Sequence, residues 1–221
     1  LEAMATKLKP FGYEYYVVDL GWYGEYELIP GTLYPAEKHA SDLNLNEFGY
    51  PLPSSCYFPN GLDALIDRCH NLGLKFGLHM MRGIPRKAVT LNLPIEGTSY
   101  HARDVAVTDP ELQCRWCHHN YAMDPDHPGT QAYYDGVIAH LARMGVDFIK
   151  YDDIVPYPED VEAVARAIDK VARPMVLSLS PGRLADPAQI AIYRMANMLR
   201  ITSDIWDDQA DIDKSFDAWK T

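Results

Sequence analysis

The 221-residue sequence is poor in cysteine, in basic residues and in long apolar runs. Its four cysteines are too few for a disulfide framework in a chain of this length. Its 20 basic residues stand against 31 acidic ones, and the net charge of −11 argues against a nucleic-acid backbone or an anionic membrane surface as a partner. No apolar stretch is long enough to span a bilayer. The remaining composition, 48% hydrophobic and 23% charged, is typical of one sizeable globular domain.

The chain begins at Leu1 rather than at a methionine, and residues 1–5 already have the character of a helix interior. We therefore expect that the amino terminus of a longer protein precedes it. A signal peptide cannot be judged from this sequence, so both a bacterial cytoplasmic and a secreted or periplasmic location stay open.

The cysteines support several interpretations. Cys69 falls on the apolar face of an expected helix and is most simply a core residue. Cys114 to His118 matches the pattern of c-type haem attachment, and the same pair could form a redox couple or half of a zinc site. No second cysteine pair supports those readings, so free thiols or one local disulfide are favoured, and no cofactor or metal is predicted.

Short apolar runs alternate with segments of helical periodicity along the chain. Glycine follows several of the helical segments, as at Gly73 and Gly145, where left-handed backbone suits it. The expected strands cover 13–19, 74–80, 146–152, 175–179 and 198–202, and the expected helices cover 61–72, 132–144, 158–172, 188–195 and 210–219. Two long loops are expected after the first and second of these strands.

This order predicts an α/β fold with a parallel sheet covered on both faces. The choice lies between a (β/α)₈ TIM barrel and an open doubly wound sheet. No Gly-x-Gly-x-x-Gly follows the first strand, whereas polar residues end every strand: Asp19, His79, Asp152, Ser180 and Asp204. That pattern favours the barrel. Five strands are fewer than eight, so we expect residues 1–221 to form a single, incomplete barrel domain.

Two carboxylates at strand ends carry the predicted chemistry. Lys150 and Asp152 point to the same face of their strand, and the ammonium favours an ionised carboxylate. Arg200 and Asp204 share parity near the last strand, and strand ends converge in a barrel. Such a pair suits a retaining glycosidase, with one carboxylate as nucleophile and the other as proton donor. Aromatic residues near the strand ends, Trp22 among them, offer flat walls for sugar rings.

Structural roles are the alternative for the same residues. Asp204 could be an N-cap for a turn containing Asp207 and Asp208, and Asp153 could support the site or cap the segment that follows the strand. Lys150 and Asp152 could form a buried ion pair, which seldom adds much stability.

The sequence resembles the α-galactosidase and α-N-acetylgalactosaminidase group, glycoside hydrolase family 27. Five motifs carry the resemblance in order along most of the chain: Gly12-Tyr13-Glu14-Tyr15 with Asp19 and Trp22; Phe58-Pro59-Asn60-Gly61; Gly73-Leu74-Lys75-Phe76-Gly77-Leu78; Gly145 to Asp152; and Arg200-x-x-x-Asp204.

The resemblance implies roles for individual residues. It makes Asp152 the nucleophile and Asp204 the general acid/base, and it places Asp19, Lys150 and Arg200 at positions that bind sugar hydroxyls. It also implies a barrel followed by a carboxyl-terminal β-sandwich, so this chain would lack the first strand, the last strands and the sandwich. The implied partner is a glycoside or oligosaccharide; the oligomeric state is left open.

Three departures from the family pattern concern the sugar. Leu20 stands where typical members have a second aspartate that helps hold hydroxyls, which puts a preference for galactose in question. His79 stands where many have tyrosine. Ser180 falls near a glutamate that recognises the 2-hydroxyl in α-galactosidases, and a serine leaves room for a larger substituent, as in α-N-acetylgalactosaminidases.

Two rival functions are also considered. A metal-dependent barrel hydrolase would use His79, His118 or His119 with the two aspartates, although the spacing of these histidines is not that of a common metal motif. A carbohydrate-binding protein without catalysis is the other, and the intact Asp152 and Asp204 argue against it.

Overall fold

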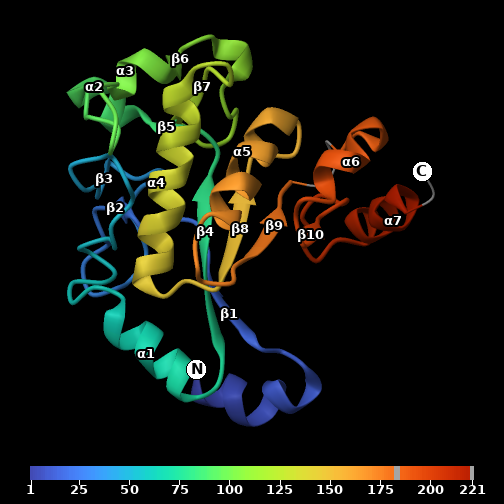
Figure 1. Cartoon of the computed structure of the whole chain (residues 1–221). Helices are drawn as coiled ribbons and strands as arrows, with labels where there is room; N and C mark the ends of the chain where they lie inside the picture. Colours follow the sequence, from blue (N-terminus) through green and yellow to red (C-terminus); the bar gives the residue numbers. More distant parts are fainter. Residues whose placement is uncertain (182–184, 220–221) are drawn as a thin grey trace.

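A five-stranded, fully parallel sheet forms the centre of the computed structural model, which describes residues 1–181 and 185–219 (Figure 1). The strand order is β1 (Tyr15–Val18), β4 (Lys75–Met81), β8 (Phe148–Asp152), β9 (Val176–Leu179) and β10 (Met198–Leu199). Successive strands pair side by side without exchange of order, as in a barrel wall. The predicted α/β class and the predicted incompleteness are confirmed, because the sheet has five strands rather than eight within the described residues.

Helices connect successive strands of the sheet (Figure 1). They are α1 (Asp63–Asn71), α4 (Pro128–Met144), α5 (Pro158–Asp169) and α6 (Ile190–Tyr193), and α7 (Gln209–Ala218) follows the last strand. A π-helix covers Met4–Leu8, and 3₁₀ turns cover Lys9–Phe11, Pro110–Leu112 and Pro187–Gln189. Helix α4 begins at a proline, after the His127 side chain accepts the Gly129 amide, and ends at Gly145 with a φ of 94°. Among the described residues, no helix has the length and apolarity that crossing a membrane requires.

The two long loops expected from sequence contain short elements. The first holds the antiparallel pair β2 (Gly24–Glu25) and β3 (Asp42–Leu43). The second, residues 82–127, holds α2 (Arg86–Leu91), α3 (Ala102–Val105) and a sheet of β5 (Ile84–Pro85), β7 (Asn120–Met123) and β6 (Ala106–Val107). The expectation of plain loops was therefore wrong. Elements of two to six residues are too short to produce a clear periodic pattern, so nothing in the sequence distinguished them from turns.

Side chains of the central strands alternate between the helix-covered face and the inner face. Ile149 and Tyr151 are buried in the main core with the apolar faces of α4 and α5. Phe148 and Lys150 instead line a cavity on the other face, with Ser178 of the next strand. The register pairs Lys150 with His79 on one side and with Ser178 on the other. Lys150 therefore points to the inner face of the sheet, as its place in the alternating strand predicted. Polar residues of several strands meet on this face.

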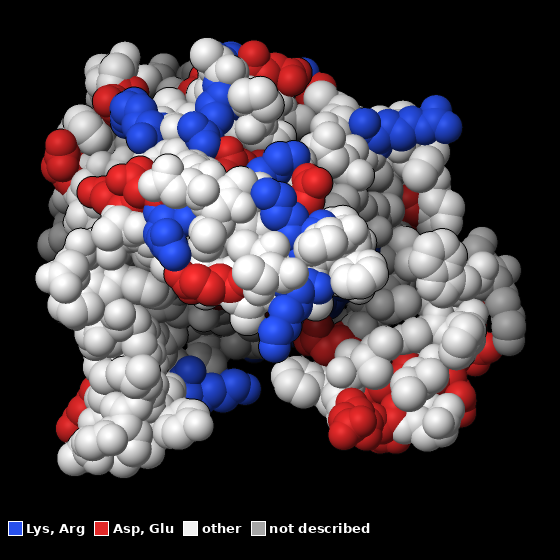
Figure 2. All heavy atoms as spheres, turned by 90° about the horizontal axis from the view of Figure 1, so that it is seen from below, with Lys and Arg blue, Asp and Glu red and all other residues white. Residues whose placement is uncertain are grey.

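The amino-terminal ends of the strands are closed by charge pairs. Asp147, just before β8, accepts hydrogen bonds from Arg173 at 2.6 Å, from the Phe76 amide at 2.8 Å and faces His70 Nε2 at 2.7 Å. Figure 2, a view from below, shows acidic and basic side chains side by side on the surface. This end of the sheet therefore has the character of a structural closure, and the candidate chemistry lies at the opposite end.

Candidate active site

Four of the predicted site residues line one cavity of about 420 Å³. Asp19, Lys150, Ser180 and Arg200 reach it from the ends of β1, β8, β9 and β10. Two polar atoms on this wall, Ser180 Oγ and Arg200 Nε, are buried and have no hydrogen-bond partner among the described residues. Because buried polar groups are normally paired, such atoms are available to a polar ligand that enters the cavity.

Asp152 ends β8 and is held from several sides although it is only 8% exposed. Its Oδ2 lies 3.3 Å from His79 Nε2 and 4.0 Å from Lys150 Nζ, and its Oδ1 accepts the Asp153 amide at 3.1 Å. Burial opposes ionisation, but the His79 hydrogen bond and the charges of His79 and Lys150 outweigh it, so the pKa of Asp152 lies below its ordinary value. Asp152 is therefore an ionised carboxylate with little water around it.

Lys150 links Asp152 to Asp19. Its ammonium donates to Asp19 Oδ2 at 2.9 Å and to Oδ1 at 3.1 Å, and the Leu20 amide donates to Asp19 Oδ1 at 2.8 Å. Burial again opposes ionisation of Asp19, and these hydrogen bonds overcome it and lower its pKa. Two carboxylates thus share one ammonium group across the ends of β1 and β8.

Trp22 and His79 form the layer beneath this cluster. Trp22 is 1% exposed, and its indole N–H donates to the His79 carbonyl at 2.7 Å. His79 is fully buried, and its Nδ1 has no partner among the described residues. The structure therefore brings both predicted residues to the site, Trp22 as a support for His79 and His79 as a direct contact of Asp152.

Arg82, which the sequence reasoning did not select, lies behind Asp152. Its backbone amide donates to the Asp152 carbonyl at 3.0 Å. Its guanidinium donates to the Asp153 carbonyl at 2.9 Å and to the Asp153 carboxylate at 3.2 Å, and it also donates to the Leu112 carbonyl at 2.5 Å. The guanidinium stacks on the Tyr157 ring, 3.5 Å from its centroid. Arg82 therefore fixes the chain on both sides of the peptide that joins Asp152 to Asp153.

Asp153 and Asp160 complete this buried network. Asp153 has a left-handed backbone with a φ of 58°, which is uncommon outside glycine, and Arg82 holds it there. Asp160 lies 3.5 Å from Arg82 Nη1 and accepts the Tyr134 hydroxyl at 2.6 Å. Burial raises the pKa of both carboxyls despite Arg82. The Asp153 carboxylate therefore belongs to this buried network, which fits the supporting role considered above, and the N-cap of the next helix, α5, is Tyr157.

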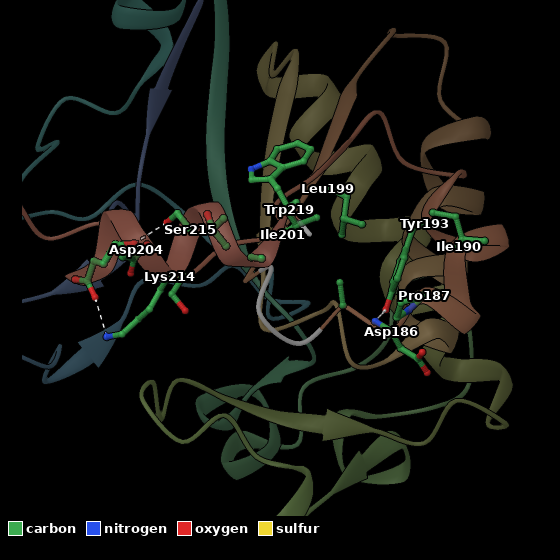
Figure 3. Close-up of a pocket in the computed structure, with 15 residues that line it drawn as sticks. Asp186, Pro187, Ile190, Tyr193, Leu199, Ile201, Asp204, Lys214, Ser215 and Trp219 are labelled. Carbon is green, nitrogen blue, oxygen red and sulfur yellow. Dashed lines mark hydrogen bonds and ion pairs between the residues drawn. The ribbon is translucent and has the colours of Figure 1, made fainter. Parts of the chain in front are cut away.

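Asp204 has different surroundings from Asp152. Its Oδ1 accepts the Arg200 guanidinium at 2.8 Å, and its side chain is 55% exposed. It lines a second cavity, of about 540 Å³, between the α6 region and α7 (Figure 3). The N-cap of α7 is Asp208, whose side chain accepts the Ala210 amide, whereas the Asp204 carboxylate pairs with Arg200. Arg200 connects the two cavities, because it lines the first and binds Asp204, which lines the second.

The histidine and cysteine candidates do not form a metal centre within the described residues. No group of three or more His, Cys, Asp or Glu side chains there has the arrangement to hold an ion. His119 packs against Tyr23 with ring centroids 5.8 Å apart, and burial lowers its pKa to about 4. All four cysteines are free thiols; Cys69 is buried in the core, as predicted, and burial raises the pKa of Cys114 to about 12.

Comparison with known proteins finds similarity to glycosidases. No family model matches the chain. A solved β-L-arabinopyranosidase of glycoside hydrolase family 27 from Geobacillus stearothermophilus is 41% identical with a TM-score of 0.87, and the match covers 98% of this chain and 51% of that one. A candidate α-N-acetylgalactosaminidase from Bacillus halodurans is 38% identical with a TM-score of 0.78, over 99% of this chain and 50% of the other.

A curated α-galactosidase from Cyamopsis tetragonoloba is 23% identical over 209 residues, which are 93% of this chain and 38% of that protein. The chain therefore spans about half the length of the solved relatives and less of the curated one.

Proposed function

We propose that this chain, a partial catalytic domain of the glycoside hydrolase family 27 group, belongs to a retaining glycosidase that removes terminal sugars of galactose configuration. The observation that carries the proposal is Asp152: a buried, ionised carboxylate at a strand end, beside Lys150 and His79 and next to a cavity with unpaired polar atoms. A nucleophile needs its negative charge, and this environment supplies it.

In the proposed mechanism, a carboxylate oxygen of Asp152 attacks the anomeric carbon while the carboxyl group of Asp204 protonates the departing glycosidic oxygen. A covalent glycosyl–enzyme forms and the leaving alcohol departs. Asp204 then removes a proton from water, the water oxygen bonds to the anomeric carbon, and Asp152 is released. We expect the two carboxyl groups to lie about 5–5.5 Å apart in the complete site. Asp19, Lys150 and Arg200 would bind ring hydroxyls, and no step requires a metal.

Asp153 is the other carboxylate at the end of this strand, and its surroundings argue against it as nucleophile. Burial raises its pKa, and both its carbonyl and its carboxylate are occupied by Arg82. Asp152 is the member of the pair with the lower pKa and with contacts to the cavity residue Lys150.

A specific observation favours a sugar without a hydroxymethyl group. Leu20 follows Asp19 where typical members of the group have a second aspartate, and it is 40% exposed at the end of β1. The relative that is 41% identical is a β-L-arabinopyranosidase, and its structure has also been solved with arabinose. L-Arabinopyranose has the ring hydroxyl pattern of galactose and lacks its C6 group. An apolar residue at this position suits the smaller sugar.

We therefore expect β-L-arabinopyranosides to be better substrates than α-D-galactosides, and Leu20→Asp to shift the ratio of the two kcat/KM values toward galactoside by roughly tenfold or more. Leu20→Asn, which adds a polar group without charge, is the matched control for charge. If neither variant changes the ratio of the two kcat/KM values, Leu20 does not determine the sugar preference.

The test of the proposed function is a panel of nitrophenyl glycosides offered to the full-length protein. The panel contains α-D-galactoside, α-N-acetyl-D-galactosaminide and β-L-arabinopyranoside with their opposite anomers as controls, and NMR follows the first-formed product anomer. Hydrolysis with retention supports the proposal, inversion contradicts the mechanism, and binding of sugars without turnover would indicate a carbohydrate-binding protein. Hydrolysis that continues in the presence of a chelator would exclude a metal-dependent hydrolase.

A further inference from the structure

A cavity of about 540 Å³ in the segment that follows β4 is lined by basic and polar side chains, although the chain as a whole is acidic. Its wall includes Arg86, Arg115 and His118, together with Gln113, Cys114 and Tyr121. No aspartate or glutamate belongs to this wall, in a chain with a net charge of −11. The volume falls within the roughly 300–1,000 Å³ of small-molecule sites. A local excess of positive charge in such a hollow attracts an anion.

Arg86 is held in place without a carboxylate partner. Its guanidinium lies over the Tyr121 ring, 4.6 Å from the centroid, and its Nε donates to the Asn120 carbonyl at 3.2 Å. Within residues 1–181 and 185–219 it forms no ion pair with an aspartate or glutamate. Stacking fixes the plane of the group, and its two terminal nitrogens remain as a fork of the kind that matches a carboxylate.

Arg115 and His118 extend the positive wall. Arg115 pairs only with Glu111, at 3.6 Å, and both side chains are more than four-fifths exposed, so water screens that pair strongly. The His118 ring faces His39, with centroids 6.0 Å apart, which joins this segment to the loop that follows β1. The Arg115 guanidinium is therefore able to turn toward a ligand at small cost.

The cavity lies close to the proposed nucleophile. Cys114 lines it and packs with Met81, which is the register partner of Asp152 on the neighbouring strand. His118, which also lines the cavity, precedes His119. The His119 ring packs against Tyr23, and Tyr23 packs against Trp22 beneath the proposed site. The basic cavity thus stands beside the carboxyl ends of β4 and β8, outside the sugar cavity of Asp19 and Lys150.

We propose that this cavity binds the carboxylate of an acidic leaving group, so that the natural substrate carries its terminal sugar on a uronic acid residue. The inference rests on the proposed glycosidase function, which it extends from the terminal sugar to the group released from it. Arg86 supplies the rigid fork, Arg115 supplies further charge around the carboxylate, and the His118 ring offers a hydrogen-bonding nitrogen.

The test measures binding rather than turnover, so that it remains informative if the glycosidase proposal fails. Sodium glucuronate and glucose are titrated separately into the full-length protein and followed by calorimetry or by NMR at constant ionic strength. We expect glucuronate to bind and glucose to bind far more weakly. Arg86→Gln and Arg115→Gln should each weaken glucuronate binding, and together by about tenfold or more, because charge-assisted hydrogen bonds are lost.

The matched control is Arg166→Gln, which removes an exposed arginine of α5 that pairs with Glu162. It should leave glucuronate binding unchanged, and melting curves should confirm that every variant is folded. Equal binding of glucuronate and glucose, no binding of either, or glucuronate binding that folded Arg86 and Arg115 variants retain in full would overturn the proposal. If glucuronate binds as expected while the neutral glycoside panel is not hydrolysed, the fault lies with the proposed function instead.

Discussion

Asp152 and Asp204 are both carboxylates near strand ends, and the chain holds them in very different ways. Asp152 is 8% exposed and has contacts with His79, Lys150 and the Asp153 amide, with Arg82 behind it. Asp204 has one ion pair within the described part of the chain, to Arg200, and a half-exposed side chain. A nucleophile must keep its charge in a site from which water is excluded, which requires such support. A group that only exchanges a proton with a leaving group or water requires less.

The largest effect is expected for Asp152, the buried carboxylate of the two. Asp152→Asn keeps the size of the side chain and removes the charge that attacks the sugar. Hydrolysis of an aryl glycoside should fall by at least about 1,000-fold, as for other enzymes that lose a nucleophile. Steady-state assays of the full-length protein measure it, and Asp153→Asn, at the neighbouring position, is the comparison. A larger loss in Asp153→Asn than in Asp152→Asn would reverse the assignment.

Asp204→Ala should produce a loss that depends on the leaving group. General acid catalysis contributes about 10²–10⁴-fold, so glycosides with a poorly acidic leaving alcohol should lose activity in that range. A nitrophenyl glycoside needs little protonation and should lose much less in the first chemical step. Pre-steady-state measurement of both substrates gives the contrast. Equal losses for both would show that Asp204 does not act as the proton donor.

Arg82→Met should reduce stability, because it leaves Asp153 and Asp160 buried without their cation. Removal of one partner of a buried ion pair costs about 3–5 kcal/mol. Arg166→Met, which breaks an exposed pair one turn apart on α5, should cost at most about 0.5 kcal/mol. Urea unfolding of both variants gives the comparison. Similar free energies of unfolding would mean that the network behind Asp152 adds nothing to stability.

The smallest effect concerns pH. His79 donates to Asp152 and lowers its pKa, so ionised Asp152 persists to more acidic pH than an ordinary aspartate. His79→Leu removes that donor and should raise the pKa of Asp152, which moves the acidic limb of kcat/KM to higher pH. His79→Gln, which can still donate, should shift the limb less. If the acidic limb of kcat/KM falls at the same pH in His79→Leu as in the wild type, that limb does not report the ionisation of Asp152.

The part of the site around Lys150 and Asp152 was also the easier part to predict from sequence. The apolar run that ends at Lys150 and Asp152 marks a strand, Gly145 marks the end of the preceding helix, and alternation puts Lys150 in the inner cavity. These signals are local, because strand and helix periodicity act over a few residues.

Local periodicity could not predict contacts between segments that are distant in the sequence. Arg82 and Asp153 are 71 residues apart, and no pattern in the sequence pairs them. The available hint was an arginine placed directly after the apolar strand Lys75–Met81, where a charge is costly unless it is paired. The short strands β5 to β7 were missed for lack of periodicity. The position of Asp204 relative to Asp152 depends on the turn after β10, which has no strong local signal.

The most direct test of the central claim is to trap the glycosyl–enzyme. A fluorinated β-L-arabinopyranosyl or α-D-galactopyranosyl donor, which slows the second step, is incubated with the full-length protein, and the adduct is located by peptide mass spectrometry. We predict one sugar per protein, attached to Asp152 and absent from the Asp152→Asn variant. A sugar attached to Asp204 or Asp153, or turnover with inversion and no adduct, would contradict the account.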